Sequence, residues 1–228
     1  MTLSDRTGFR SWLLAVFLTL VTMPICFSSA SAFDDLSPIG RLNDFFTRLH
    51  TIEAEFVQQI YESDNQTPSV SRGLFSAKKP GLFRWDYSEP FEQVILSDAD
   101  SVYFYEVDLA QVTKSSAARL EQTPAAFFVS DRPLSQTFAL SVTEDSTWHV
   151  PGVRLVPLKE GSIQEIVLTL HPQKDELLNL QVLDSLGNHS RFGFQNVRFN
   201  QPLPEDRFVF VRPPEVDLIE ETPEKTGL

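Results

Sequence analysis

Between residues 36 and 49 the apolar side chains recur every three or four positions. Leu42, Phe45, Phe46 and Leu49 follow this spacing, which places them on one narrow face of an α-helix. From residue 52 the period changes to two. The apolar positions Ile52, Ala54, Phe56 and Ile60 alternate with Glu53, Glu55, Val57 and Gln59. A period of two is typical of a β-strand whose two faces differ. The pattern therefore predicts an amphipathic helix followed directly by a strand.

Alternating segments of this kind continue to about residue 211, separated by turns rich in Pro, Gly and Asp. Thr123 and Pro124 precede an apolar run that ends at Val129, and they predict a short helix with Thr123 as N-cap and Pro124 at the first helical position. There is no βαβ alternation and no internal repeat, and the tail after Pro213 and Pro214 is expected to be loosely held. The predicted strands are 52–60, 70–77, 82–87, 93–96, 102–107, 110–114, 136–142, 147–151, 153–157, 163–170, 177–184, 189–200 and 207–211.

This order of elements predicts a fold that is mainly β, in the α+β class. We expect an incomplete antiparallel β-barrel of about eleven strands, with two or three lid helices on its concave face.

The first 32 residues have the features of a secretory signal peptide. A positively charged start precedes an apolar run over 12–27, and Ala30 and Ala32 have the small-residue spacing that signal peptidase requires. The apolar run is short for a membrane span and Pro24 interrupts it, which favours cleavage near Ala32 over a retained anchor. We therefore expect a cleaved signal over 1–32, export to the periplasm, and a single half-barrel domain over 33–228.

Composition narrows the possible functions. The only cysteine, Cys26, lies in the predicted signal, so thiol chemistry and disulfides are not expected after cleavage. The formal net charge of −12 argues against nucleic acid and against an anionic membrane surface as partners. Phenylalanine is abundant, with 19 in the chain, of which Phe9, Phe17 and Phe27 fall in the signal.

The common catalytic motifs are missing from the sequence. None of the four histidines has a second ligand at the i, i+4 spacing of a zinc helix, and the chain has neither a G-x-S-x-G elbow nor a phosphate-binding glycine loop. We therefore predict no enzymatic activity, no catalytic residues, no metal and no cofactor. A hydrolase that needs only two distant carboxylates stays a disfavoured alternative.

The most distinctive segment is KPGLFRWDYSEP, residues 79–90. It continues through VILSD (94–98), VYFY (102–105) and DLAQV (108–112), and the segments 43–59, 123–124 and 200–214 agree as well. This ordered set resembles the periplasmic lipoprotein carrier family LolA over nearly all of residues 36–218. The resemblance implies a monomeric half-barrel with an apolar cavity that takes the acyl chains of outer-membrane lipoproteins. It also implies that the cargo comes from an ATP-driven inner-membrane complex and passes to a receptor lipoprotein in the outer membrane.

Two residues depart from the family pattern. Lys79 stands where the family has an arginine before Pro-Gly, and Ala99 stands for the glycine of S-D-G. In the family that arginine is thought to hold the lid shut through bonds to backbone carbonyls. A lysine keeps the charge but lacks the fork of donors, so Lys79 is our candidate for a lid latch.

The candidate site is the lid and the cavity below it. Phe127 and Phe128 are the candidates for a lid plug, because adjacent residues on a short helix cannot both face one core direction, although ordinary core packing is the alternative for each aromatic residue. The alternative to the carrier function is a periplasmic regulator with the same half-barrel, which senses lipid or lipoprotein. The other candidates are the second lid surface, Leu42, Phe45, Phe46 and Leu49, and the concave wall or its rim, Phe56, Leu74, Phe83, Trp85, Tyr87 and Phe104.

Overall fold

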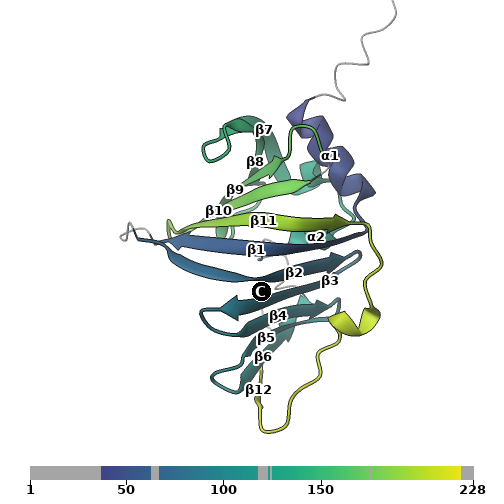
Figure 1. The fold of residues 1–228 in the computed structure, drawn as a ribbon, viewed down its shortest axis with the longest axis vertical. Coiled ribbons are helices and arrows are strands. Elements are labelled where there is room, and N and C mark those ends of the chain that lie inside the picture. Colours follow the sequence, from purple (N-terminus) through teal and green to yellow (C-terminus); the bar gives the residue numbers. More distant parts are fainter. Residues whose placement is uncertain (1–36, 63–66, 118–122, 124, 175, 222–228) are drawn as a thin grey trace, which may run out of the picture. The chain divides into compact units, whose positions relative to one another are not determined.

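One twelve-stranded sheet accounts for most of the computed structural model, which describes residues 37–62, 67–117, 123, 125–174 and 176–221. The strand order is β12-β6-β5-β4-β3-β2-β1-β11-β10-β9-β8-β7, so the sheet is open, with β12 and β7 at its edges (Figure 1). Neighbouring strands are antiparallel except β12 and β6. The strands are β1 (Thr51–Tyr61), β2 (Ser69–Lys78), β3 (Leu82–Glu89), β4 (Gln93–Asp98), β5 (Ser101–Glu106), β6 (Gln111–Ser116), β7 (Phe138–Asp145), β8 (Val150–Pro157), β9 (Ile163–Leu170), β10 (Leu177–Asp184), β11 (His189–Phe199) and β12 (Asp217–Glu220).

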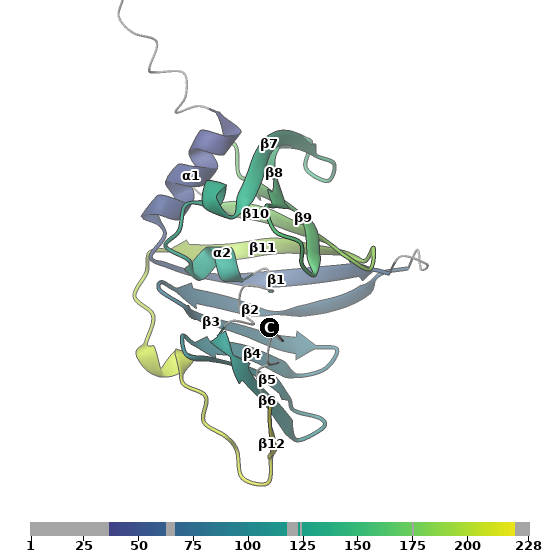
Figure 2. The same ribbon diagram turned by 180° about the vertical axis from the view of Figure 1, so that it is seen from behind.

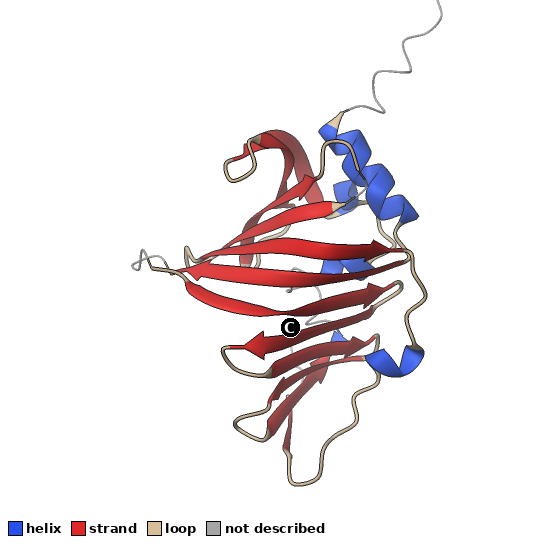
Figure 3. Ribbon diagram, viewed as in Figure 1, coloured by secondary structure: helices blue, strands red, loops and turns tan. Residues whose placement is uncertain are grey.

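The helices are few in the described residues, and strands dominate (Figure 3). They are α1 (Pro38–Arg48), α2 (Ala126–Val129) and two 3₁₀ turns, η3 (Leu134–Gln136) and η4 (Glu205–Phe208). None of these helices is long and apolar enough to cross a membrane. All described residues belong to one compact unit, Ala32–Leu228, and the predicted signal peptide lies outside them.

Helix α1 confirms the amphipathic helix that the apolar spacing predicted, with Leu42, Phe45 and Phe46 buried. It begins after Ser37, whose hydroxyl accepts a hydrogen bond from the backbone N–H of Gly40 at 2.9 Å, and Pro38 occupies the first turn. Helix α2 is shorter than predicted, because it begins at Ala126 after Ala125. The N-cap residue is Ala125, and the Thr123 carbonyl accepts a hydrogen bond from the N–H of Ala126. Pro124 lies outside the described residues.

The predicted mainly β class is confirmed, but three strand predictions need correction. Residues 147–149 form a turn rather than part of a strand, and β8 runs through Gly152 without a break. The predicted strand 207–211 is absent: residues 207–208 end η4, and residues 209–211 belong to no strand. Part of the tail is ordered, because β12 pairs with β6.

The register divides the sheet into two faces. On the inner face Ala54 of β1 is opposite Phe75 of β2, which is opposite Trp85 of β3, and Ile95 of β4 comes next. Side chains of β8 and β9, such as Val153 and Leu168, belong to the same hydrophobic core as these residues. The sheet must therefore curve strongly, as expected for an incomplete barrel. Helix α2 lies behind the sheet in Figure 1 and in front of it in Figure 2, on the inner face.

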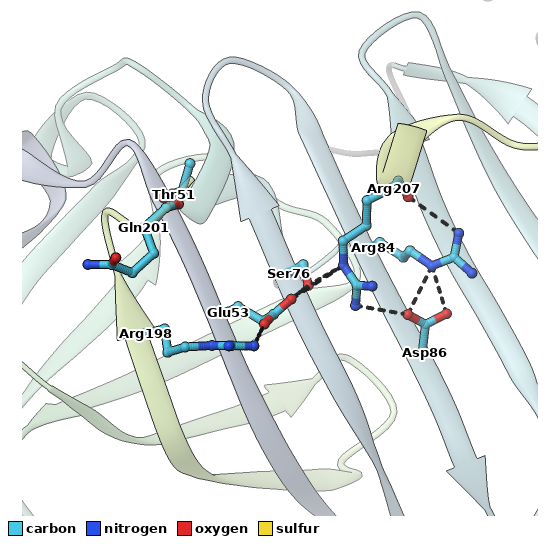
Figure 4. Close-up of polar contacts among 8 residues, drawn as sticks. All are labelled: Thr51, Glu53, Ser76, Arg84, Asp86, Arg198, Gln201 and Arg207. Atoms are coloured by element: carbon cyan, nitrogen blue, oxygen red, sulfur yellow. Dashed lines mark hydrogen bonds and ion pairs between the residues drawn. The ribbon is translucent and has the colours of Figure 1, made fainter. Parts of the chain in front are cut away.

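The outer face carries a polar cluster around Glu53 (Figure 4). This carboxylate is nearly buried, pairs with Arg198 and Arg207, and accepts a hydrogen bond from Ser76. Arg207 also donates to Ser76 at 2.8 Å and pairs with Asp86 at 3.3 Å. These contacts fix η4 on the outer face of β1 to β3, so residues after β11 cover that side rather than the inner one.

A second buried carboxylate holds the β7–β8 hairpin in place. Asp145 is fully buried, and its Oδ2 accepts hydrogen bonds from Thr169 at 2.7 Å, Asn179 at 2.7 Å and Gln181 at 3.3 Å. Its Oδ1 accepts from the backbone N–H groups of the turn that follows. Burial alone would raise the pKa of Asp145, but these hydrogen bonds outweigh it and lower the pKa below its ordinary value.

Candidate functional site

An aromatic cluster fills the space between the inner face and the two α-helices. Phe46 of α1 lies 5.8 Å from Phe127 and 5.6 Å from Phe128 of α2, measured between ring centroids. Phe128 in turn lies 5.0 Å from Phe75 of β2, and Phe75 lies 4.5 Å from Trp85 of β3. The two helices and the sheet are therefore joined through one continuous set of rings.

The cluster continues along the sheet itself. The ring of Phe56 lies 5.7 Å from Trp85, 5.0 Å from Tyr87 and 6.1 Å from Phe192. Phe192 and the neighbouring Phe194 come from β11, which pairs with β1. Aromatic contacts of this kind stabilise a core beyond their buried area by about 0.5–1.5 kcal/mol each.

Both phenylalanines of α2 are buried, Phe127 at 5% and Phe128 at 0% relative exposure. From the sequence, Phe127 and Phe128 were not expected to face the same core direction, because they are adjacent on a short helix. The structure shows how both avoid water: Phe128 contacts the sheet through Phe75, while Phe127 contacts α1 through Phe46. Helix α2 thus lies between two apolar partners.

Most of the other predicted residues join the same core, and Leu74 does not. Leu74 is opposite Glu55 and Asp86 in the sheet, on the outer face. It lines a groove of about 460 Å³ there, together with Glu53 and Arg198, so we leave it out of the candidate cavity. The residues that the structure brings together are Leu42, Phe45, Phe46, Leu49, Phe56, Phe83, Trp85, Phe127 and Phe128, with Tyr87 and Phe104 partly buried against them.

Sequence reasoning missed Phe75, Phe192 and Phe194. All three are buried in the core. Phe75 and Phe192 contact predicted residues, and Phe194 contacts Phe75. The alternation in β2 and β11 could have indicated these residues. Phe75 is two residues from the buried Ala77, and Phe192 is two residues from Phe194, so each pair lies on one face of its strand.

The turn between β2 and β3 contacts the C-terminal ends of both helices. The Nζ of Lys79 donates a hydrogen bond of 2.8 Å to the carbonyl oxygen of Phe46 in α1. Two residues later the backbone N–H of Gly81 donates to the carbonyl of Val129, the last residue of α2, at 3.0 Å. Gly81 has φ +75°, a conformation that favours glycine. The Lys-Pro-Gly turn therefore connects the sheet to both candidate lids.

The environment of Lys79 is partly desolvated. Burial lowers the pKa of Lys79 from its ordinary value, and the negative charge of Asp131 acts in the opposite direction. The contact with α1 therefore combines a favourable charged hydrogen bond with an unfavourable loss of hydration.

The chemistry of this site is apolar. Within the described ranges, no group of three or more His, Cys, Asp or Glu side chains is placed to hold a metal ion. Burial raises the pKa of Tyr87, so its hydroxyl stays protonated at neutral pH. The arrangement suits an apolar ligand that would replace the rings of α1 and α2 on the inner face.

Comparison with known proteins agrees with the resemblance found in the sequence. Residues 47–211 match the family described as outer membrane lipoprotein carrier protein LolA. An outer-membrane lipoprotein carrier protein of Methylococcus capsulatus is 31% identical over 90% of this chain and 98% of its own length, and one of Nitrosospira multiformis is 30% identical over 80% and 88%. A crystal structure of a LolA superfamily protein from Nitrosomonas europaea matches 76% of this chain and 98% of its own, with 12% identity and a TM-score of 0.43. The chain thus belongs to the LolA family of outer-membrane lipoprotein carrier proteins.

Proposed function

We propose that this protein carries lipoproteins across the periplasm, with their acyl chains held between the inner face of the sheet and helices α1 and α2. The observation that carries the proposal is the aromatic cluster that runs from Phe46 through Phe128 and Phe75 to Trp85. Membership of the family supports it, because the relatives are named as outer-membrane lipoprotein carriers.

The energy of acyl-chain transfer explains why such a carrier needs movable lids. Each buried CH₂ group contributes about 0.8 kcal/mol, so one acyl chain of ordinary length gains on the order of 12 kcal/mol on leaving water. A carrier must match much of this energy and still release its cargo. In this structure Phe46, Phe127 and Phe128 pack against one another, and Phe128 packs on the inner-face ring of Phe75. Exchanging one apolar contact for another keeps the net energy of uptake and release small.

We further propose the route on which the protein acts. After removal of the predicted signal near Ala32, the carrier receives cargo from an ATP-driven inner-membrane complex and delivers it to a receptor lipoprotein of the outer membrane. It acts as a monomer, without cofactor or catalytic residues, and the contact of Lys79 with Phe46 serves as the lid latch.

Identification of what accompanies the protein in the periplasm tests this function. We expect the purified periplasmic protein to bring down acylated lipoproteins, detected by mass spectrometry of their lipid-modified N-terminal peptides. Recovery of a lone transmembrane anti-sigma factor instead would contradict the carrier and favour the regulator. A Phe56→Ser variant places a hydroxyl in the centre of the inner face, so it should lower the recovery of lipoproteins.

A further inference from the structure

Trp85 is a buried donor that lacks an acceptor. The side chain is 4% exposed at the centre of the inner face. Its indole Nε1 has no hydrogen-bond partner, and among the described side chains only one other buried atom, on Arg191, shares that condition. Buried tryptophan N–H groups usually have a partner, and an unpaired buried donor destabilises a fold. An unpaired group of this kind therefore calls for a functional reason.

The surroundings of the indole explain why its N–H has no hydrogen-bond partner. Phe75 and Ile95 flank Trp85 on the adjacent strands, and the rings of Phe56 and Phe192 lie 5.7 and 5.3 Å from it. All four side chains are hydrocarbons without an acceptor.

The lid is linked to this donor through a single ring. Phe75 lies between Trp85, at 4.5 Å, and Phe128 of α2, at 5.0 Å. Displacement of α2 would therefore remove a ring from Phe75 and change the packing beside the indole. A ligand that takes the place of Phe128 would reach the neighbourhood of the unpaired donor.

We infer that the indole N–H of Trp85 donates a hydrogen bond to the ester or amide carbonyl oxygen at the head of a bound acyl chain. The inference rests on the proposed function and adds a polar subsite to the apolar site. Every acyl chain in ester or amide linkage carries this carbonyl, which loses its hydration when the chain is buried. A hydrogen bond between this carbonyl oxygen and the indole N–H of Trp85 gives each of the two buried groups a partner. The hydroxyl of Tyr87, two residues along the same face of β3, is a second donor near this position.

A pair of matched lipids tests the subsite. 1-Monopalmitoylglycerol and 1-O-hexadecylglycerol have the same headgroup and chain length, but only the first has a carbonyl. We expect the protein to bind the ester roughly three- to tenfold more tightly than the ether. Trp85→Phe keeps an aromatic ring and removes the donor, so it should bind the two lipids equally.

A direct signal from the wild-type protein keeps the test independent of how the variant folds. The full chain has three tryptophans, and Trp148 is 51% exposed and serves as an internal reference. After ¹⁵N labelling, with single Trp→Phe variants to assign the indole resonances, the Trp85 N–H proton should move downfield with the ester and not with the ether. Tight binding of both lipids without preference and without this shift would overturn the inference and leave the proposed function intact. Failure of either lipid to bind would overturn both.

Discussion

The ammonium of Lys79 donates a hydrogen bond to the carbonyl oxygen of Phe46 over 2.8 Å. Phe46 lies in the last turn of α1, where carbonyl groups lack a partner within the helix and a positive charge is favourable. Partial burial of the lysine opposes this gain, and it lowers the pKa of Lys79. Burial therefore weakens the contact, which suits the proposed role of Lys79 as a latch that must open.

We predict that Lys79→Met weakens closure of the lid. Loss of the hydrogen bond should increase the rate of uptake of monopalmitoylglycerol roughly two- to tenfold, measured by stopped-flow fluorescence. Lys79→Arg should restore slow uptake. The neighbouring Lys78 pairs with Glu205 on the opposite side of the sheet, so Lys78→Met is the matched control and should leave the rate unchanged. Equal rates in the Lys79→Met and wild-type proteins would show that the contact is not a latch.

The phenylalanines of α2 provide a second prediction. Replacing Phe127 and Phe128 together with alanine should lower the free energy of unfolding by at least about 3–5 kcal/mol and expose the inner face. Binding of an apolar dye should rise in the absence of cargo, and release of lipoproteins from spheroplasts should fall. Phe208→Ala removes an equally buried ring near β3 and β4, away from the lids, so it should destabilise the fold and leave dye binding near the wild-type level. Normal release by the double variant would contradict the assignment of α2 as a lid.

Gly73 allows the ring of Phe56 to lie close against β2. A Cβ atom at this position would overlap the backbone of Asp86 and come within 2.9 Å of the Phe56 ring. Gly73→Ala should therefore lower the free energy of unfolding by about 1–3 kcal/mol and displace Phe56 from the inner face. A Cβ atom on Gly193 would have no neighbour within 4 Å, so Gly193→Ala is the control and should change stability by less than about 1 kcal/mol. Chemical denaturation measures both, and equal stabilities would contradict the register at Phe56.

The buried Asp145 predicts a specific dependence of stability on pH. Its pKa is lower in the folded protein than in the unfolded chain, where an aspartate titrates at about 3.9. Its contribution is therefore complete above roughly pH 5 and declines as the pH falls further through the lowered pKa. Asp145→Asn should lower the free energy of unfolding by about 1–3 kcal/mol at pH 7.

The difference between the wild-type protein and Asp145→Asn should shrink between pH 5 and pH 2 (roughly the range in which such a carboxylate titrates). Urea denaturation at a series of pH values measures this difference. Glu144→Gln, at an exposed neighbour, is the control and should follow the wild-type curve. A difference that is constant with pH would contradict the role of the charged carboxylate.

Local periodicity was sufficient to predict most of the fold. The spacing from Leu42 to Leu49 identified α1, and alternation identified most of the strands. It failed at Gly152, where the sequence indicated a break. The structure has a continuous strand there because the glycine admits a close approach of the Thr169 side chain, at 3.1 Å from the position of a Cβ. It also failed at β12, because four residues with two acidic ends are too short to show a period.

The candidate site depended on information that a single strand does not contain. Leu74 and Phe75 are adjacent, and only the pairing of β2 with β1 decides which of them faces the helices. The partners of Asp145 come from two other strands, β9 and β10, so no local motif could indicate them. By contrast, the Lys-Pro-Gly turn was recognisable from the sequence, and the structure places it beside both helices.

Release of a newly made outer-membrane lipoprotein from spheroplasts tests the central claim most directly. Added wild-type protein should move the lipoprotein into the soluble fraction as a one-to-one complex with its acyl chains attached, and the Phe127→Ala and Phe128→Ala double variant should release far less. Retention of the lipoprotein in the spheroplast membrane in the presence of the wild-type protein would contradict the account.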